Sequence, residues 1–295
     1  MANSLSSSLV LDSISRTVIL PLGGIFAPAQ AFTTDFSTET YTKGQNVRLR
    51  IANAGPTVQT NPTNWESGDS GQDNVNLPVN HYSVSWQIDP DAVEKGWRLD
   101  QLAAKAYQNF GNKLMDVMLA PLTSSGTTNF ANIAVAQASL ARANLQTVWA
   151  AIANASTKNL ILDAVAFSQL LPADANGFKL GQGAYGFDNW FLNTRWNGAG
   201  TNVYGFAGHP GALGIITGLP VMEDETKEDI NTTTLSIPLA QGGTGQSSSG
   251  STITAYASTW VSRATRIRWA SLDIMAGAAK LDNSACRVFV SAANP

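Results

Sequence analysis

The chain has 295 residues, enough for one large domain or two closely packed ones, and 44% of them are hydrophobic, so a sizeable core can form. Only 13% are Asp, Glu, Lys or Arg, about half the share of a typical soluble domain, and the net charge is −3. This balance argues against a protein that binds nucleic acid through a basic excess, and it favours packing against copies of the same chain.

The first 42 residues predict a short helix over 4–16 and an irregular arm over 17–42. The apolar run Val18–Phe26, followed by Ala-Pro-Ala-Gln-Ala, resembles the core and cleavage site of a signal peptide. However, Met1–Ser15 is long for such a leader and contains no Lys or Arg, so we expect the helix and arm to remain in the mature chain. No apolar run approaches the roughly 18 residues of a membrane span.

Residues 43–51 and 81–88 alternate apolar and polar side chains, as half-buried strands do. Their apolar positions are Val47, Leu49 and Ile51 in the first segment and Tyr82, Val84, Trp86 and Ile88 in the second. The connection 52–80 is polar, rich in Pro and Gly, and longer than compact domains normally leave without structure. We predict a two-stranded arm with a long polar tip, too poor in apolar surface to fold onto its own core and dependent on a partner subunit.

A long helix is predicted to follow the arm. Asp89 suits the N-cap, Pro90 suits the first helical position, and Pro121 is expected to end the helix. Its apolar residues recur at the spacing of one helical face, and its length is about 45 Å. These residues are Leu99, Leu102, Ala103, Ala106, Tyr107, Phe110, Leu114, Val117 and Met118.

The rest of the chain alternates shorter elements with loops. In chain order we predict a helix over 135–153, a buried strand over 159–163, a short helix over 164–171, Gly- and aromatic-rich loops over 172–210, a strand and turn over 215–221, a flexible Gly/Ser-rich segment over 240–252, and closing strands over 265–273 and 286–291.

No residue pattern indicates catalysis, cofactor binding or metal binding. The chain has two histidines, His81 and His209, and neither is spaced from Cys or another His as metal ligands are. Cys286 cannot form an internal disulfide, and its apolar surroundings favour a buried thiol. No Gly-x-Ser-x-Gly sequence is present. We therefore predict that the chain contains no catalytic, cofactor-binding or metal-ligating residue.

Three further patterns favour surface roles. The stretch 241–246 resembles a phosphate-binding loop but lacks its Lys-Ser/Thr and a following helix, so a flexible loop is preferred. The acidic residues Glu223, Asp224, Glu225, Glu228 and Asp229 match no calcium loop and indicate a solvated stretch. The arginines Arg263, Arg266 and Arg268 are predicted to be ordinary surface residues, with contacts to DNA or to a neighbour's carboxylates as the alternative.

The order of these parts resembles the major capsid (coat) proteins of tailed bacteriophages, which have the Hong Kong 97-type fold, and especially the short coat proteins of podovirus-type phages. The similarity covers nearly the whole chain. The stretches that carry it are Met1–Leu11, Thr42–Arg50, Asn159–Leu171, Gly218–Glu223 and Thr265–Val290, the last of which is similar to the family's closing hairpin.

The resemblance implies an α+β subunit with an N-terminal arm, an extended β-hairpin loop, a long spine helix, and peripheral and axial domains. The implied division is 1–42 for the N-terminal helix and arm, 43–88 for the extended loop, 89–155 for the spine helix and peripheral domain, 156–262 for the axial domain, and 263–295 for the closing strands of the peripheral domain.

The resemblance also implies a structural protein without enzyme activity, whose copies form pentamers and hexamers of an icosahedral head around double-stranded DNA. The implied partners are further copies, a portal protein, scaffolding or decoration proteins, and packaged DNA bound non-specifically, with no membrane. The implied location is the virion, after assembly in the host cytoplasm. Two alternatives stay open: an encapsulin-like shell, and a secreted hydrolase or carbohydrate-binding protein, which the eight Trp and the low charge also fit.

Overall fold

The computed structural model describes residues 33–35, 46–52, 60, 72–88, 97–123, 130–152, 157–170, 184–193, 203–220, 227–238 and 252–291. The helix predicted over 4–16 and the capping residues Asp89 and Pro90 lie outside these ranges. So does the segment 240–252, apart from Thr252.

A six-stranded sheet is built around β12, the longest strand in the described residues. Antiparallel β4 lies along one edge of β12 over Arg268–Ala276. The opposite edge is shared by β11, over Arg268–Asp273, and β9, over Met275–Lys280. β10 extends the sheet beyond β11, and β1 pairs in parallel with β9. The bounds are β1 Thr33–Asp35, β4 Asn80–Ile88, β9 Leu213–Gly218, β10 Lys227–Pro238, β11 Thr252–Ser262 and β12 Arg268–Lys280.

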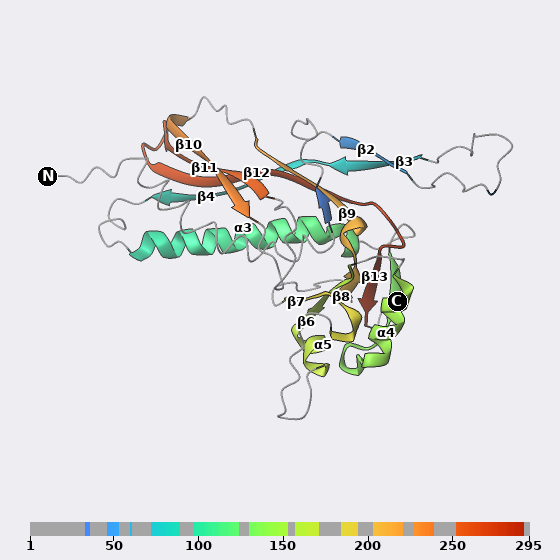
Figure 1. Ribbon diagram of the computed structural model, residues 1–295. Helices are drawn as coiled ribbons and strands as arrows, with labels where there is room; N and C mark the ends of the chain where they lie inside the picture. The colour runs from blue at the N-terminus through green and yellow to red at the C-terminus, as the bar shows by residue number, and fades with distance from the viewer. Residues whose placement is uncertain are drawn as a thin grey trace.

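The helix α3 (Trp97–Thr123) lies along one face of this sheet and is about 40 Å long (Figure 1). Its buried side chains follow the predicted helical spacing, and the ring of Tyr107 packs edge-on against Trp86 of β4 with 5.5 Å between ring centroids. The side chain of Leu102, also predicted to face the core, is outside the description. The buried positions are Ala103, Tyr107, Phe110, Leu114 and Met118, and the exposed ones on the other face include Lys105, Gln108, Asn109, Lys113 and Asp116.

Both ends of α3 differ from the prediction. The described helix begins at Trp97, and residues 89–96 lie outside the description. Pro121 was predicted to end the helix but lies inside its last turn. Proline weakens a helix by removing one hydrogen bond to the preceding turn. Because only two residues of α3 follow Pro121, the helix loses little by including it.

A five-stranded sheet, with order β5-β13-β8-β6-β7, forms a second unit at the C-terminal end of α3 (Figure 1). The helices α4 and α5 pack against it, and Leu145, Val148, Leu160, Phe187 and Phe289 meet in its core. The bounds are β5 Ala131–Ala134, α4 Arg142–Ala151, β6 Asn159–Asp163, α5 Ala164–Gln169, β7 Asn189–Asn193, β8 Val203–Gly208 and β13 Cys286–Val290, with short 3-10 turns η1 Gln137–Ser139, η2 Ala184–Gly186 and η3 Pro210–Ala212.

Two cations bind the C-terminal carbonyls of α4. Lys158 Nζ donates to the carbonyl of Trp149 at 2.8 Å, and Arg287 Nη2 donates to that of Ala151 at 2.7 Å. Positive charge at this end of a helix offsets the partial negative charge of its unpaired carbonyls. These contacts tie α4 to the strands β6 and β13.

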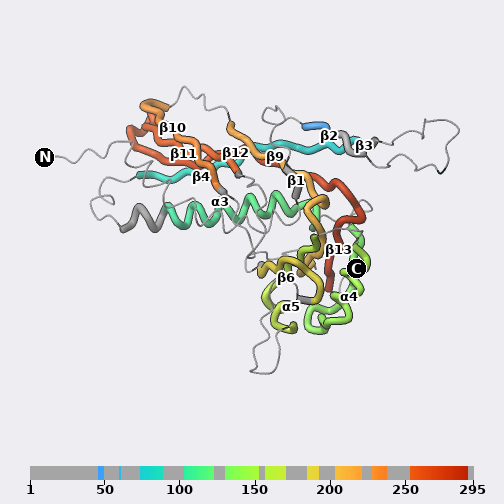
Figure 2. The backbone as a smooth tube through the Cα atoms, viewed as in Figure 1, coloured from blue at the N-terminus to red at the C-terminus, as the bar shows by residue number. Residues whose placement is uncertain are grey.

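The two units form a continuous body. The chain passes between them at the connections from α3 to β5, from η3 to β9 and from β12 to β13 (Figure 2). Leu119 and Leu122, at the end of α3, pack in one cluster with Ile161, Phe206 and Val288 of the five-stranded sheet. The C-terminal turn of α3 therefore belongs to the cores of both units.

Several predicted elements are confirmed, and others are wrong. β6, α5 and β9 match the elements predicted over 159–163, 164–171 and 215–221. The helix predicted over 135–153 begins only at Arg142, because β5 and η1 precede it. The loops predicted over 172–210 contain β7 and β8, and the arm predicted to be irregular contains β1. β12 and β13 do not form a hairpin, since they belong to different sheets.

The sheets also group the chain differently from the ranges that the resemblance implied. β5 and α4 lie with the five-stranded sheet, although the range 89–155 groups them with the spine helix in the peripheral domain. β10 and β11 belong to the six-stranded sheet, although 156–262 assigns them to the axial domain. β13, within 263–295, belongs to the five-stranded sheet. Pairing between strands far apart in the sequence sets these memberships.

Phe110→Ala should lower the free energy of unfolding by about 3–5 kcal/mol, because it removes a buried ring from the contact between α3 and the sheet. Chemical denaturation monitored by circular dichroism measures this change. Gln108→Ala, at an exposed position of the same helix, should change stability by less than about 0.5 kcal/mol. Equal stability of the two variants would show that this face of α3 is not packed.

Candidate functional site

A two-stranded hairpin of β2 (Asn46–Ala52) and β3 (Gln72–Pro78) extends from the six-stranded sheet (Figure 1). Asn46 pairs with Pro78 at its base and Ala52 pairs with Gln72 at its far end. Within the described part of the chain, neither strand pairs with a third one. Among the described residues, both outer edges of the hairpin are thus without a neighbouring strand, and an edge of this kind can accept an added strand.

The predicted partner of the first arm strand is wrong. Residues 81–88 form β4, which pairs with β12, and the partner of β2 is β3. β3 was missed because only Val75 and Leu77 are apolar in a segment rich in Asn and Asp and ended by Pro78. Its alternation is thus too short to distinguish it from the polar connection.

The base of the hairpin packs against the subunit's own sheet, contrary to the expectation that the arm lacks apolar surface for this. Val47 and Leu49 of β2 and Leu77 of β3 are buried. They form one cluster with Val79, Ile216 of β9, and Met275 and Ala279 of β12. One face of the hairpin base is therefore covered by the subunit's own sheet, while Asn46, Arg48 and Asn76 on its other face are exposed.

Gly277 marks the point where the hairpin crosses β12. A Cβ atom at this position would lie 2.0 Å from the carbonyl oxygen of Pro78 and 2.7 Å from Cδ2 of Leu77. Only a residue without a side chain lets two backbones approach this closely. Because Val79 alone separates β3 from β4, this crossing fixes the direction in which the hairpin leaves the sheet.

Ser271, Asp273 and His81 form a chain of hydrogen bonds on the six-stranded sheet. Ser271 Oγ donates to Asp273 Oδ2 at 2.5 Å, and His81 Nε2 lies 3.1 Å from Asp273 Oδ1. In a nucleophilic triad the imidazole lies between the hydroxyl and the carboxylate, where it can accept the hydroxyl proton. Here the carboxylate lies in the middle and is buried with Ser271, so the arrangement satisfies a buried acid and does not activate the serine.

His209 and Cys286 lie in the five-stranded unit and have local roles. His209 Nδ1 accepts a hydrogen bond from the backbone N–H of Gly211 at 3.1 Å and so caps η3. Burial lowers the pKa of His209; Lys158 acts in the same direction and Asp282 opposes it. Cys286 is fully buried, as its apolar surroundings indicated, and burial raises the pKa of its thiol.

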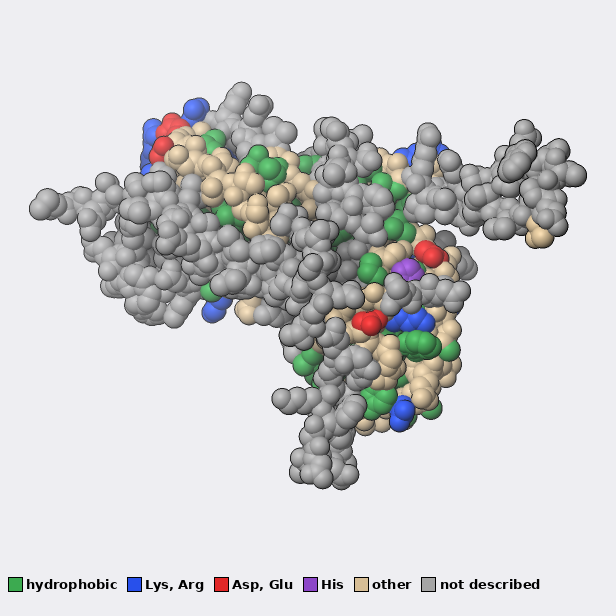
Figure 3. Space-filling model, in the orientation of Figure 1, with side chains coloured by type: hydrophobic (Ala, Val, Ile, Leu, Met, Phe, Trp, Pro, Cys, Tyr) green, Lys and Arg blue, Asp and Glu red, His purple; other side chains and the backbone are tan. Residues whose placement is uncertain are grey.

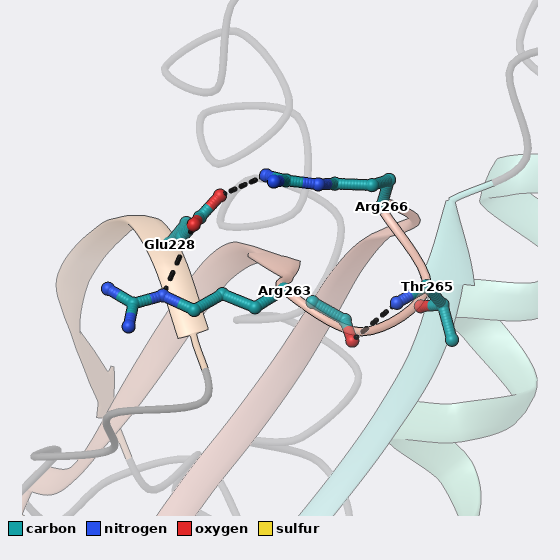
Figure 4. Close-up of polar contacts among 5 residues, drawn as sticks. Glu228, Arg263, Thr265 and Arg266 are labelled. Atoms are coloured by element: carbon teal, nitrogen blue, oxygen red, sulfur yellow. Dashed lines mark hydrogen bonds and ion pairs between the residues drawn. The ribbon is translucent and has the colours of Figure 1, made fainter.

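Charged side chains gather at the end of the sheet where β10 meets the turn between β11 and β12. Glu228 binds two arginines: Arg263 Nε lies 3.2 Å from Oε1 and Arg266 Nη1 lies 2.5 Å from Oε2 (Figure 4). Asp229 binds Arg268 Nη2 at 3.2 Å. The space-filling view shows these acidic and basic side chains together on the surface at that end of the molecule (Figure 3). Two residues of the acidic run, Glu228 and Asp229, thus meet the arginines, and Glu223, Asp224 and Glu225 lie outside the described residues.

The described residues offer little for other kinds of chemistry. They contain no group of three His, Cys, Asp or Glu side chains that could hold a metal ion. None of the helices described is both long enough and apolar enough to cross a membrane. The hairpin and the charged end of the sheet are therefore the candidate functional surfaces.

The fold is similar to those of several solved structures. A capsid of the native GTA particle aligns with a TM-score of 0.55 and 9% identity, covering 91% of this chain and 90% of that one. A virus-like particle from Pyrococcus furiosus aligns with a TM-score of 0.54 and 12% identity, covering 94% of this chain and 98% of that one. A structure from Gordonia phage Cozz aligns with a TM-score of 0.52 and 10% identity, covering 91% of this chain and 86% of that one. No protein-family model matches the sequence, and neither does any curated protein.

The chain therefore has the α+β fold of tailed-phage major capsid proteins, the Hong Kong 97-type fold that the sequence resemblance implied. The likeness extends over nine-tenths of the chain, although only about one residue in ten is identical. It is thus a likeness of fold.

Gly277→Ala should lower the free energy of unfolding by about 1–3 kcal/mol, because the added methyl group forces β3 away from β12. Chemical denaturation measures this, and faster protease cleavage of the hairpin should accompany it. Adding Leu77→Ala should not restore stability, since the closest contact is with the Pro78 backbone. Wild-type stability of the single variant would contradict a tight crossing.

Stability should fall as pH decreases through about 6.5, the pKa of an unfolded histidine, because the folded state holds His209 at a lower pKa and resists its protonation. Asn at this position keeps an acceptor for Gly211 N–H but does not titrate. The stability of His209→Asn relative to wild type should therefore rise between pH 7.5 and pH 5.5, as measured by denaturation at each pH. A constant difference would show that His209 titrates alike in both states.

Proposed function

We propose that this chain is the major capsid protein of a tailed bacteriophage, whose copies assemble into the pentamers and hexamers of an icosahedral head. The observation that carries the proposal is the shared architecture, which covers most of this chain and most of a GTA capsid chain. Self-association fits this reading, because a charge-poor chain has little self-repulsion to keep its copies apart.

The shape of the subunit supplies unlike surfaces for contacts between copies. The hairpin leaves the sheet near Gly277, toward one end of β12, and the charged cluster lies at Arg268, the other end. Contacts between unlike surfaces of identical subunits run head to tail, and they close into rings when the rotation between neighbours allows it. Pentamers and hexamers are rings of this kind.

The proposed partners follow from this role. They are further copies of the chain, a portal protein, scaffolding or decoration proteins, and packaged double-stranded DNA held without sequence preference. The proposed location is the virion, after assembly in the host cytoplasm. Within the subunit we assign α3 and the six-stranded sheet to the peripheral domain, and the five-stranded sheet to the axial domain.

The role proposed is structural, without catalysis. The buried Ser271–Asp273–His81 chain has the wrong order for a nucleophile, and the thiol of Cys286 is inaccessible. An encapsulin-like shell is the less favoured alternative, because phage and GTA structures are among the neighbours that share the fold. A secreted hydrolase or carbohydrate-binding protein has no support from these neighbours.

Replacing residues 53–71 with Asn-Gly should give a folded protein that no longer assembles. The turn would join Ala52 to Gln72, which face each other at the end of the β2–β3 ladder, so the hairpin and its packed base stay intact. Circular dichroism checks folding, and sedimentation with negative-stain electron microscopy checks for rings and shells. Wild type should form them, with scaffolding protein co-expressed if required.

A matched control replaces residues 239–251 with the same Asn-Gly turn, joining Pro238 to Thr252, which also face each other in a ladder. This variant should fold and assemble like wild type. Normal shells from the 53–71 variant would contradict a role of the arm in assembly. Its unfolding would show that the arm tip belongs to the subunit's own core, and a wild type that stays monomeric would contradict the proposed function itself.

A further inference from the structure

The charged end of the six-stranded sheet brings together acidic side chains of β10 and arginines of the β11–β12 turn. It is named here the arginine corner and consists of Lys227, Glu228, Asp229, Arg263, Arg266 and Arg268. The corner holds four cations and two anions, a net charge of +2, in a chain whose net charge is −3. The rest of the chain therefore carries a net charge of −5.

Backbone geometry builds the corner. Consecutive strand residues normally point to opposite faces. A register shift in β10 after Glu228, with Asp229 at a φ of +50°, lets both acids reach the arginines. On the other side, Arg266 lies at the end of the β11–β12 turn with a φ of +56°, and its N–H donates to the carbonyl of Ser262 at 2.8 Å. Both sides of the corner thus use the left-handed conformation, which is unfavourable for residues other than glycine.

Two of the arginines retain most of their binding capacity. Each guanidinium has five N–H donors. Within the described residues Arg263 uses Nε and Arg266 uses Nη1, both toward Glu228, and Figure 4 shows the outer nitrogens of Arg263 directed away from that carboxylate. Their side chains are 58% and 72% exposed. Glu228 therefore holds the two side chains in place and leaves their remaining donors facing outward.

We infer that the arginine corner is a contact between subunits, in which Arg263 and Arg266 bind carboxylates of a second copy of this chain. The inference rests on the proposed function and adds a specific surface to it. The arginines are pre-ordered by Glu228, so binding a further carboxylate restricts little additional side-chain freedom. Overall charge complementarity favours this partner, since the residues outside the corner sum to −5 in each copy.

A protein carboxylate fits this surface better than a nucleic acid does. The backbone of DNA presents a dense row of phosphates, and a protein binds it by neutralising many of them. Here Glu228 and Asp229 lie within 3.2 Å of the arginines and would repel a phosphate row. A single carboxylate can approach Arg263 or Arg266 from the side opposite Glu228.

The test compares two variants that break the same ion pairs inside the subunit. R263Q/R266Q removes the proposed intermolecular donors, whereas E228Q keeps them. We expect R263Q/R266Q to raise the protein concentration needed for assembly by about fivefold and to make assembly less sensitive to salt, as loss of two exposed charge pairs would. E228Q keeps both arginines but loses the carboxylate that orders them, so it should raise the concentration needed for assembly by less than R263Q/R266Q does. Sedimentation across a concentration series at low and high salt measures both effects.

K105Q/K113Q, on the exposed face of α3, removes the same number of positive charges and should leave assembly unchanged. Equal effects of this control and R263Q/R266Q would overturn the inference in favour of net charge alone. Equal effects of E228Q and R263Q/R266Q would show that the corner acts only within one subunit. If R263Q/R266Q unfolds, the single variant R266Q is tested for assembly in its place. The Arg266 side chain is mostly exposed, so this substitution should leave the fold intact.

Three outcomes separate this inference from its alternatives. If R263Q/R266Q assembles like wild type but retains less short duplex DNA in a binding assay, the corner is a nucleic-acid contact and the inference is wrong. If wild type itself forms no rings or shells, the proposed function fails and the inference fails with it. Normal assembly of wild type together with normal assembly of R263Q/R266Q overturns the inference alone.

Discussion

The structure depends on the contact between one long strand and one long helix. β12 has 13 residues and spans about 43 Å, and α3 has 27 residues and spans about 40 Å, so each can cover the other along its length. Small residues such as Ala270 and Ala276 on β12 let α3 approach closely, while Trp86 and Tyr107 fill the space beside them. Five strands of two sheets then pair with β12 or with β13, which follows it in the chain.

This constraint also determines the surfaces proposed for assembly. The register of β4 on β12 ends where Asn80 faces Ala276, one residue before the crossing at Gly277. The position of the hairpin is thus set by the same ladder that holds the core. At the opposite end of β12, Arg268 begins the strand and belongs to the arginine corner. One rigid strand therefore separates the two surfaces by a fixed distance, as an assembly with repeated geometry requires.

The sequence predicted those elements whose signal is local. The stripe of α3 is readable because Tyr107, Phe110 and Leu114 repeat at helical spacing, and β6 is readable as a short apolar run between polar residues. The strands and side chains that these elements contact were less predictable. The pairing of β4 with β12, the separation of β12 from β13, and the cations that cap α4 all join residues far apart in the chain. The sequence indicated surface roles for the acidic residues and the arginines, but it did not predict their pairing, because Glu228 and Arg266 are 38 positions apart and meet only through the β10–β11 pairing.

The central place of β12 has a consequence for the order in which the chain can fold. β4 ends at Ile88, but its partner strand is complete only at Lys280, near the end of the sequence. During synthesis the apolar faces of β4 and α3 therefore lack their partner β12 until residue 280 has been synthesised. Pairing between strands so far apart in the sequence is slow, and apolar surface that is exposed in the meantime favours chaperone binding. A nascent chain cannot complete the six-stranded sheet, so only finished subunits can offer both ends of β12 to their neighbours.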